Sequence, residues 1–160
     1  MTIKKFEDIE AWQLARSMCL MVKTLSEQGK FAQDWSLRNQ IRASSGSVMD
    51  CIAEGFGRAQ NNEFRYFLGV AKGSCEECRS QTYRALDFAY ISTNEFNALM
   101  DLCNRTSGAI QGLISYLNKT SYKGSRNLVP PPKTDLTTDA LNHRNHEDQY
   151  FPTLPPNSKP

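Results

Sequence analysis

The pair Cys75-x-x-Cys78 has the spacing in this sequence that is most typical of redox or metal chemistry. A reactive thiolate needs a positive electrostatic field, such as a helix N-terminus supplies, and a tetrahedral zinc site needs four ligands. Neither requirement is met, because Glu76 and Glu77 lie between the two thiols and no second cysteine pair accompanies them. Both cysteines also fall on the apolar stripe of an expected helix, so we interpret them as core residues.

Most other catalytic groups are excluded by composition. The first 129 residues contain neither histidine nor proline, since His143, His146 and all 7 prolines come later. A Ser-His-Asp triad, a Cys-His pair, an HExxH zinc site and a Glu-x-x-His di-iron motif are therefore absent from that part. Weak metal binding by His143 and His146, beside Glu147 and Asp148, competes with a solvated polar segment, which is the simpler interpretation. We predict no enzyme activity, no cofactor and no metal site.

The compartment is indicated by the five cysteines, which are odd in number and follow no secretory signal. The longest apolar run, Met18 to Val22, is far shorter than the roughly 20 residues of a membrane span. We therefore expect a cytoplasmic protein that does not enter a membrane. The net charge of +2, from 19 Lys and Arg against 17 Asp and Glu, does not by itself indicate nucleic-acid binding.

Two pairs of glycines stand inside expected helices, where each glycine costs about 1 kcal/mol relative to alanine. Gly69 and Gly73 are one turn apart, and so are Gly108 and Gly112. Counting 100° per residue places both pairs on faces that point away from the expected core. A flat groove of this kind lets another backbone approach closely, so we predict an oligomer interface at these glycines. Tolerated surface glycines are the alternative.

Basic residues recur along two of the expected helices. Three are spaced by seven residues, one precedes them, and two more are one turn apart on the preceding helix. Repeated around a symmetric oligomer, such a stripe would contact nucleic-acid phosphates. The alternative is a solvated charged face, because Glu63 and Glu76 lie among the cations. The candidate nucleic-acid-binding residues are Arg38, Arg42, Arg58, Arg65, Lys72 and Arg79.

Four segments carry apolar residues at alternating steps of three and four, which predicts amphipathic helices. The helices are expected over Phe6 to Gln28, Asp34 to Phe56, Asn62 to Ile91 and Ser92 to Lys119. Asp34 is suited to cap the second helix, and Ser92-Thr93-Asn94-Glu95 is a capping box that begins the fourth. Gly29 is expected to end the first helix. Gly55-Phe56-Gly57 lacks the third glycine of a phosphate loop, so we interpret it as the turn that ends the second.

Short loops of about two to six residues between such long helices force neighbouring helices to run antiparallel. We therefore predict an all-α protein with an up-down-up-down four-helix bundle in residues 1–123. From about Gly124 the periodicity disappears and proline becomes frequent, so residues 124–160 are predicted to form a disordered proline-rich tail.

Three stretches of the sequence together carry a family resemblance. They are Phe6 to Ala15 (FEDIEAWQLA), Gln40 to Arg58, where QIRAS leads into IAEGFGR, and Glu63 to Ser74, with EF, FL and AKGS. These residues resemble the bacterial four helix bundle proteins, the products of intervening sequences in 23S ribosomal RNA genes, often labelled S23 ribosomal proteins. The resemblance covers about residues 4–120. Family members commonly read Ser-Ile-Pro-x-Asn-Ile-Ala-Glu-Gly where this chain has SVMDCIAEG at Ser47 to Gly55, so the proline and the asparagine are replaced.

The resemblance also implies a kind of assembly and a kind of partner. The family is similar in fold to the accessory variability determinant of diversity-generating retroelements, a barrel-shaped homopentamer that binds nucleic acid and the retroelement's reverse transcriptase. A non-enzymatic pentameric bundle that presents basic surfaces to RNA or to a polymerase is therefore implied.

Three functions remain open from the sequence. The first is a homo-oligomeric scaffold, with a pentamer favoured, that binds RNA or a complex of nucleic acid and reverse transcriptase through the six basic residues. The second is a protein-protein adapter without nucleic-acid contact, which docks a partner through its glycine face or its tail. The third is a cysteine-dependent redox enzyme, which requires Cys75 or Cys78 to be exposed and reactive.

Overall fold

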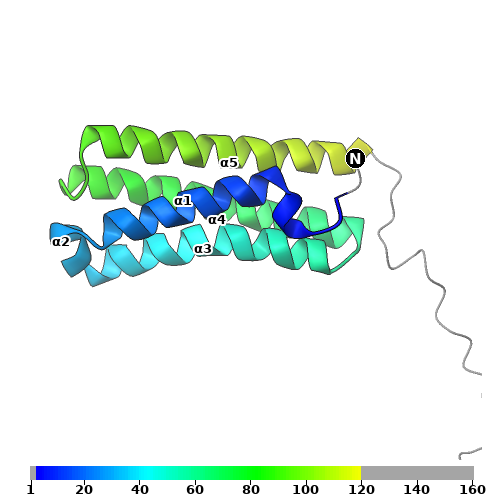
Figure 1. Cartoon of the computed structure of the whole chain (residues 1–160), viewed down its shortest axis with the longest axis horizontal. Helices are drawn as coiled ribbons and strands as arrows, with labels where there is room; N and C mark the ends of the chain where they lie inside the picture. The colour runs from blue at the N-terminus through cyan, green and yellow to red at the C-terminus, as the bar shows by residue number, and fades with distance from the viewer. Residues whose placement is uncertain (1–2, 120–160) are drawn as a thin grey trace, which may run out of the picture. The chain divides into compact units, whose positions relative to one another are not determined.

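Residues 3–119 are described by the structure, a computed structural model. Within these residues the chain forms a short 3-10 turn and five α-helices, four of them long (Figure 1). The elements are η1 (Phe6–Asp8), α1 (Glu10–Ser26), α2 (Gly29–Gln33), α3 (Trp35–Gly57), α4 (Asn61–Asp87) and α5 (Thr93–Lys119). The predicted tail, the predicted domain boundary after residue 123, and His143 and His146 lie outside the described residues.

The four long helices form an antiparallel bundle in which each packs against two others. Helix α3 packs against α1 and α4, and α5 packs against α4 and α1, so the chain goes round the bundle in the order α1, α3, α4, α5 (Figure 1). The predicted all-α fold with antiparallel helices is confirmed. The α1–α3 edge and the α4–α5 edge are therefore opposite edges of the bundle.

The core is built from the apolar stripes that the sequence predicts. Every long helix contributes side chains that are almost fully removed from water, and burying each stabilises the fold by about 1.5–3 kcal/mol for a large aliphatic group. The buried stripe residues include Ala15, Met18 and Val22 of α1, Leu37, Ile41, Val48 and Ile52 of α3, Leu68, Ala71, Cys75 and Cys78 of α4, and Leu99, Cys103 and Ile110 of α5.

Both predicted helix caps are present. The Asp34 carboxylate accepts a hydrogen bond from the Leu37 amide at 2.9 Å, which satisfies one free donor at the start of α3. At the start of α5, the Ser92 hydroxyl accepts from the Glu95 amide at 3.3 Å, while the Glu95 carboxylate accepts from the Ser92 amide at 2.7 Å. This reciprocal pair is the predicted capping box.

The first predicted helix is shorter than expected and is followed by a helix that the sequence did not indicate. Ile9 adopts an extended conformation between η1 and α1, and α1 ends at Ser26. Gly29, with φ +48°, then lets the chain turn into α2. The short α2 forms because Phe31 is buried and stacks on Tyr90 with ring centroids 5.4 Å apart, which covers one end of the bundle.

Two other predicted features differ from the structure at the ends of α3 and α4. The third predicted helix extends to Ile91, but α4 ends at Asp87 because Ala89 adopts a left-handed φ of 54° and lies outside the core. Gly55 is not part of a turn; it is buried inside α3, where an added Cβ would lie 2.6 Å from the Phe67 Cβ of α4. The glycine is therefore required by the close approach of α3 to α4.

Candidate nucleic-acid interface

A row of cross-helix hydrogen bonds runs along the α4–α5 edge of the bundle. Arg65 donates to the Asn118 Oδ1 at 2.6 Å, and Lys72 donates to the Gln111 Oε1 at 2.7 Å. Further along, the Ser107 hydroxyl donates to the Glu76 carboxylate at 3.1 Å. We call this row the α4–α5 seam. The seven-residue spacing of Arg65, Lys72 and Arg79 places all three along it, since α4 turns almost twice in seven residues.

The three cations of the seam differ in how their charges are compensated. Arg79 forms an ion pair with Glu76 on the same helix. Arg65 and Lys72 instead bond to the neutral amides of Asn62, Asn118 and Gln111, and within residues 3–119 neither forms an ion pair. Their positive charges therefore remain available to a phosphate.

The four candidate interface glycines lie on the outward faces of α4 and α5, beside the seam and not on it. Gly73 follows Lys72 in the chain and Gly112 follows Gln111, and successive residues of a helix point about 100° apart. All four glycines are exposed, and a Cβ added at Gly69, Gly73, Gly108 or Gly112 would meet no atom within 4 Å. The glycines and the two uncompensated cations therefore lie on neighbouring faces of α4 and α5.

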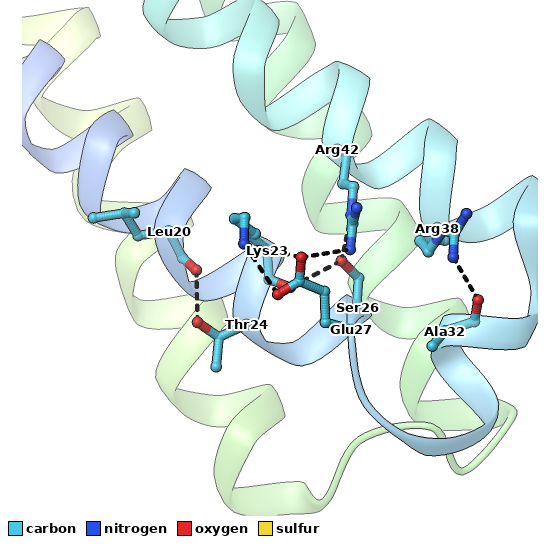
Figure 2. A network of polar contacts seen from close by, with 8 residues as sticks. All are labelled: Leu20, Lys23, Thr24, Ser26, Glu27, Ala32, Arg38 and Arg42. Atoms are coloured by element: carbon cyan, nitrogen blue, oxygen red, sulfur yellow. Dashed lines mark hydrogen bonds and ion pairs between the residues drawn. The ribbon is translucent and has the colours of Figure 1, made fainter.

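Arg38 and Arg42 lie on the opposite edge, where α1, α2 and α3 meet. Figure 2 shows Arg42 reaching from α3 to the end of α1, where it donates to the Ser26 hydroxyl at 2.7 Å and lies 3.7 Å from the Glu27 carboxylate. Glu27 also pairs with Lys23 at 2.9 Å. Arg38 donates to the backbone carbonyl of Ala32 at 2.7 Å, so both arginines help to hold the α1–α2–α3 connection together.

Arg58 occupies a third position, at the turn between α3 and α4. Its guanidinium lies 2.5 Å from the Glu54 carboxylate and 3.8 Å from that of Glu63, and it packs over the Phe67 ring at 5.2 Å. The charge of Arg58 is therefore compensated twice. Within this chain, the six candidate residues do not form a single surface but divide between two opposite edges and this turn.

The cysteine pair lies in the core, as the sequence predicts. Cys75 and Cys78 are fully buried, and the Cys75 thiol donates to the backbone carbonyl of Cys103 at 3.3 Å. Contact with Cys103 and burial together raise the pKa of the Cys75 thiol far above its usual value. In the described part of the chain, no three His, Cys, Asp or Glu side chains lie together as a metal site. A buried thiol with a raised pKa is a poor nucleophile, which speaks against the redox hypothesis.

Several exposed aromatic side chains are not among the candidate residues predicted from the sequence, and Trp35 is the most exposed of those in residues 3–119. Trp35, the first residue of α3, is 69% exposed, and the guanidinium of Arg38 lies over its ring at 4.3 Å from the centroid. Trp35 does not belong to the apolar stripe that begins at Leu37, and this is visible in the sequence. A tryptophan outside an apolar stripe must face water or a partner, so its exposure was predictable.

The comparisons with known proteins indicate a family. The family described as 23S rRNA-intervening sequence protein matches residues 7–112. A crystal structure of a protein of unknown function from the S23 ribosomal protein family, from Bacteroides thetaiotaomicron, is similar with a TM-score of 0.59 and 14% identity, over 66% of this chain and 95% of that one. At this identity the likeness concerns the fold alone. The comparison with curated proteins gave no match.

The family match and the fold agree. The matched residues 7–112 include nearly all of the four long helices, and the similar crystal structure comes from the S23 ribosomal protein family. None of the helices in residues 3–119 has the length and hydropathy needed to cross a bilayer. The chain belongs to the 23S rRNA-intervening sequence protein family.

Proposed function

We propose that this chain is a non-catalytic scaffold that assembles with copies of itself, most simply as a pentamer, and binds RNA through basic helix faces. The family name refers to the intervening sequence of a ribosomal RNA gene that encodes such proteins, so the support for RNA binding comes from the charged surfaces and not from the name. A partner that carries both RNA and a polymerase, such as a reverse transcriptase complex, fits the same surfaces. Retroelement partners follow from the family resemblance alone.

The observation that carries the proposal is the state of the α4–α5 seam. Arg65 and Lys72 bond to neutral amides, so two positive charges lie about two helix turns apart on one edge without ion pairs among the described residues to compensate them. The neighbouring glycines expose helix backbone and leave open space, which permits a phosphate backbone to approach closely. A charged face of this kind binds phosphates by releasing their counterions.

The proposal is tested by reversing the two charges in the double variant Arg65→Glu/Lys72→Glu. Binding of a fluorescein-labelled RNA hairpin with a large unpaired loop is measured by anisotropy between about 50 and 200 mM salt. We expect at least a tenfold loss of affinity, with the slope of log affinity against log salt reduced by about 1 for each lost phosphate contact.

The matched control is Arg16→Glu/Arg105→Glu, which makes the same change of net charge at two exposed arginines outside the candidate set. The control should retain most of the RNA affinity. Circular dichroism should show unchanged helix content in both variants, and light scattering should give the same subunit number as the wild-type protein. Equal losses in both variants, or binding that ignores salt and the charge reversal, would show that the seam does not bind RNA.

A protein-protein adapter without nucleic-acid contact is the second candidate. Tyr66 is 68% exposed on α4, and Val70, one turn later, is also exposed. Exposed aromatic and aliphatic side chains on one face are typical of protein docking sites. If the wild-type protein binds no RNA at low salt, this face becomes the leading candidate, and Tyr66→Ser/Val70→Ser should then prevent pull-down of the partner.

A further inference from the structure

The packing of the fold gives no reason for an exposed tryptophan at position 35. In residues 3–119 no large apolar side chain is more exposed, although burying an indole is strongly favourable. The N-terminus of α3 does not need it, because Asp34 already supplies the cap. Between Glu27 and Gln60, Trp35 is also the single exposed large apolar side chain.

The surroundings of Trp35 are positioned and positively charged. The Arg38 guanidinium lies 4.3 Å from the ring centroid and is held in place by its hydrogen bond to the Ala32 carbonyl of α2 (Figure 2). Within the described residues, Arg38 forms no ion pair. One guanidinium is therefore fixed against the indole with its charge uncompensated.

The wider corner has the same sign of charge. Residues 23–42 contain four cations, Lys23, Lys30, Arg38 and Arg42, against the two carboxylates Glu27 and Asp34. Both carboxylates are engaged, Glu27 with Lys23 and Arg42, and Asp34 with the Leu37 amide and the Tyr90 hydroxyl. The hydrogen bond from Lys23, with the charges of Arg42 and Arg38, lowers the pKa of Glu27, which reflects the positive field.

A ligand that fits this corner has a flat apolar surface and a negative charge beside it. An unpaired nucleotide has both, since its base can stack on the indole while its phosphate lies near Arg38. A base within a duplex cannot stack in this way, because both of its faces are already covered. An apolar peptide segment would leave the positive charge of Arg38 uncompensated, whereas a phosphate compensates it.

We propose that Trp35 and Arg38 form a stacking platform for an unpaired RNA base at the α1–α3 edge, on the side of the bundle opposite the α4–α5 seam. This inference rests on the proposed RNA-binding function and adds to it the kind of RNA that is recognised. A bundle with phosphate contacts on one edge and a base platform on the opposite edge prefers RNA that contains single-stranded segments over uniform duplex.

The test compares two probes, fluorescein-labelled oligoadenylate and a blunt RNA duplex of equal length. Trp35→Ala should weaken oligoadenylate binding about tenfold, which corresponds to about 1.4 kcal/mol, and should change duplex binding less than about twofold. Trp35→Phe, which keeps a flat ring, should retain most of the affinity. The control Tyr116→Ala removes another strongly exposed aromatic ring, on α5, and should bind both probes as the wild-type protein does.

A spectroscopic readout tests stacking directly. The chain has 2 tryptophans, so in a Trp12→Phe protein the remaining emission comes from Trp35, and oligoadenylate should quench it. Unchanged oligoadenylate binding by Trp35→Ala, while Arg65→Glu/Lys72→Glu still weakens RNA binding, would overturn the platform and leave the proposed function standing. If the wild-type protein binds neither probe at low salt, the proposed function and the platform are both wrong.

Discussion

Replacing Gly55 by alanine tests the close approach of α3 to α4. A Cβ at this position would lie 2.6 Å from the Phe67 Cβ and 3.0 Å from the Phe64 Cδ2. The Phe67 Cβ is bonded directly to the backbone of α4, so it cannot move away by a change of rotamer. The overlap is relieved only if α3 and α4 separate locally, and overpacking of this kind costs about 1–3 kcal/mol.

The same substitution at Gly46 provides the matched control. Gly46 also lies inside α3, but a Cβ there would meet no atom within 4 Å. Gly46→Ala should therefore stabilise the protein by about 0.4–1 kcal/mol, because alanine is the better helix former and restricts the unfolded chain. Gly55→Ala gains the same helix propensity but also suffers the steric overlap with Phe67. The free energies of unfolding of the two variants should therefore differ by about 1–3 kcal/mol.

Urea unfolding followed by circular dichroism measures both variants against the wild-type protein. The midpoint should rise for Gly46→Ala and fall for Gly55→Ala, with the slope unchanged because the surface exposed on unfolding is the same. If Gly55→Ala were as stable as Gly46→Ala, α3 and α4 would not approach as closely as described, and the interpretation of Gly55 as a packing residue would fail.

Three further outcomes follow from local structure. Ala89→Gly should stabilise the protein by about 1 kcal/mol in urea unfolding, because Ala89 has a left-handed φ of 54°, which glycine adopts without strain. Ala89 ends α4 with hydrogen bonds from its own amide to the Leu86 carbonyl and from the Tyr90 amide to the Ala85 carbonyl. If the glycine variant were no more stable than the wild-type protein, the left-handed turn would be absent. Hydrogen bonds from Ser92 lower the pKa of Glu95, so the carboxylate stabilises the folded state at neutral pH and loses this contribution as the pH falls through its lowered folded value. Glu95→Gln should therefore be less stable than wild type at pH 7, with a difference that narrows below about pH 4; a difference independent of pH contradicts the capping box. Cys75 should not react with iodoacetamide in the native protein and should react in urea, because the thiol is buried. Mass spectrometry of the peptides measures the alkylation. Alkylation of Cys75 in the native protein would support the redox hypothesis.

The long helices were predictable because their signals are local. The stripe from Leu37 to Ile52 repeats with the helical period, and Asp34 supplies a cap immediately before it. Helix α2 was not predictable in the same way, since it has five residues and depends on Phe31 packing against Tyr90, which is 59 positions later in the chain. A helix of one turn shows no periodicity, and tertiary burial decides whether it forms.

The candidate site was predictable only within one helix. Spacing by seven correctly places Arg65 and Lys72 on one edge, because residues of one helix share a rigid geometry. It cannot show that Arg38 lies on the opposite edge, since periodicity identifies the buried face of α3 but not which neighbour packs on each side of it. The partners Gln111 and Asn118 are also invisible to local patterns, because they come from a different helix.

The neighbouring positions of the glycines and the seam cations on α4 and α5 limit how the proposed assembly can form. A subunit docked over the seam would remove Arg65 and Lys72 from water beside neutral amides, and an uncompensated buried charge costs several kcal/mol. The proposed self-association through Gly73 and Gly112 would therefore use the outward side of the two helices and leave the seam open to solvent. An unchanged subunit number in Arg65→Glu/Lys72→Glu follows from this geometry. Dissociation of that variant would instead place the seam inside the subunit interface, and the α1–α3 edge with Trp35 and Arg38 would then be the surface left for RNA.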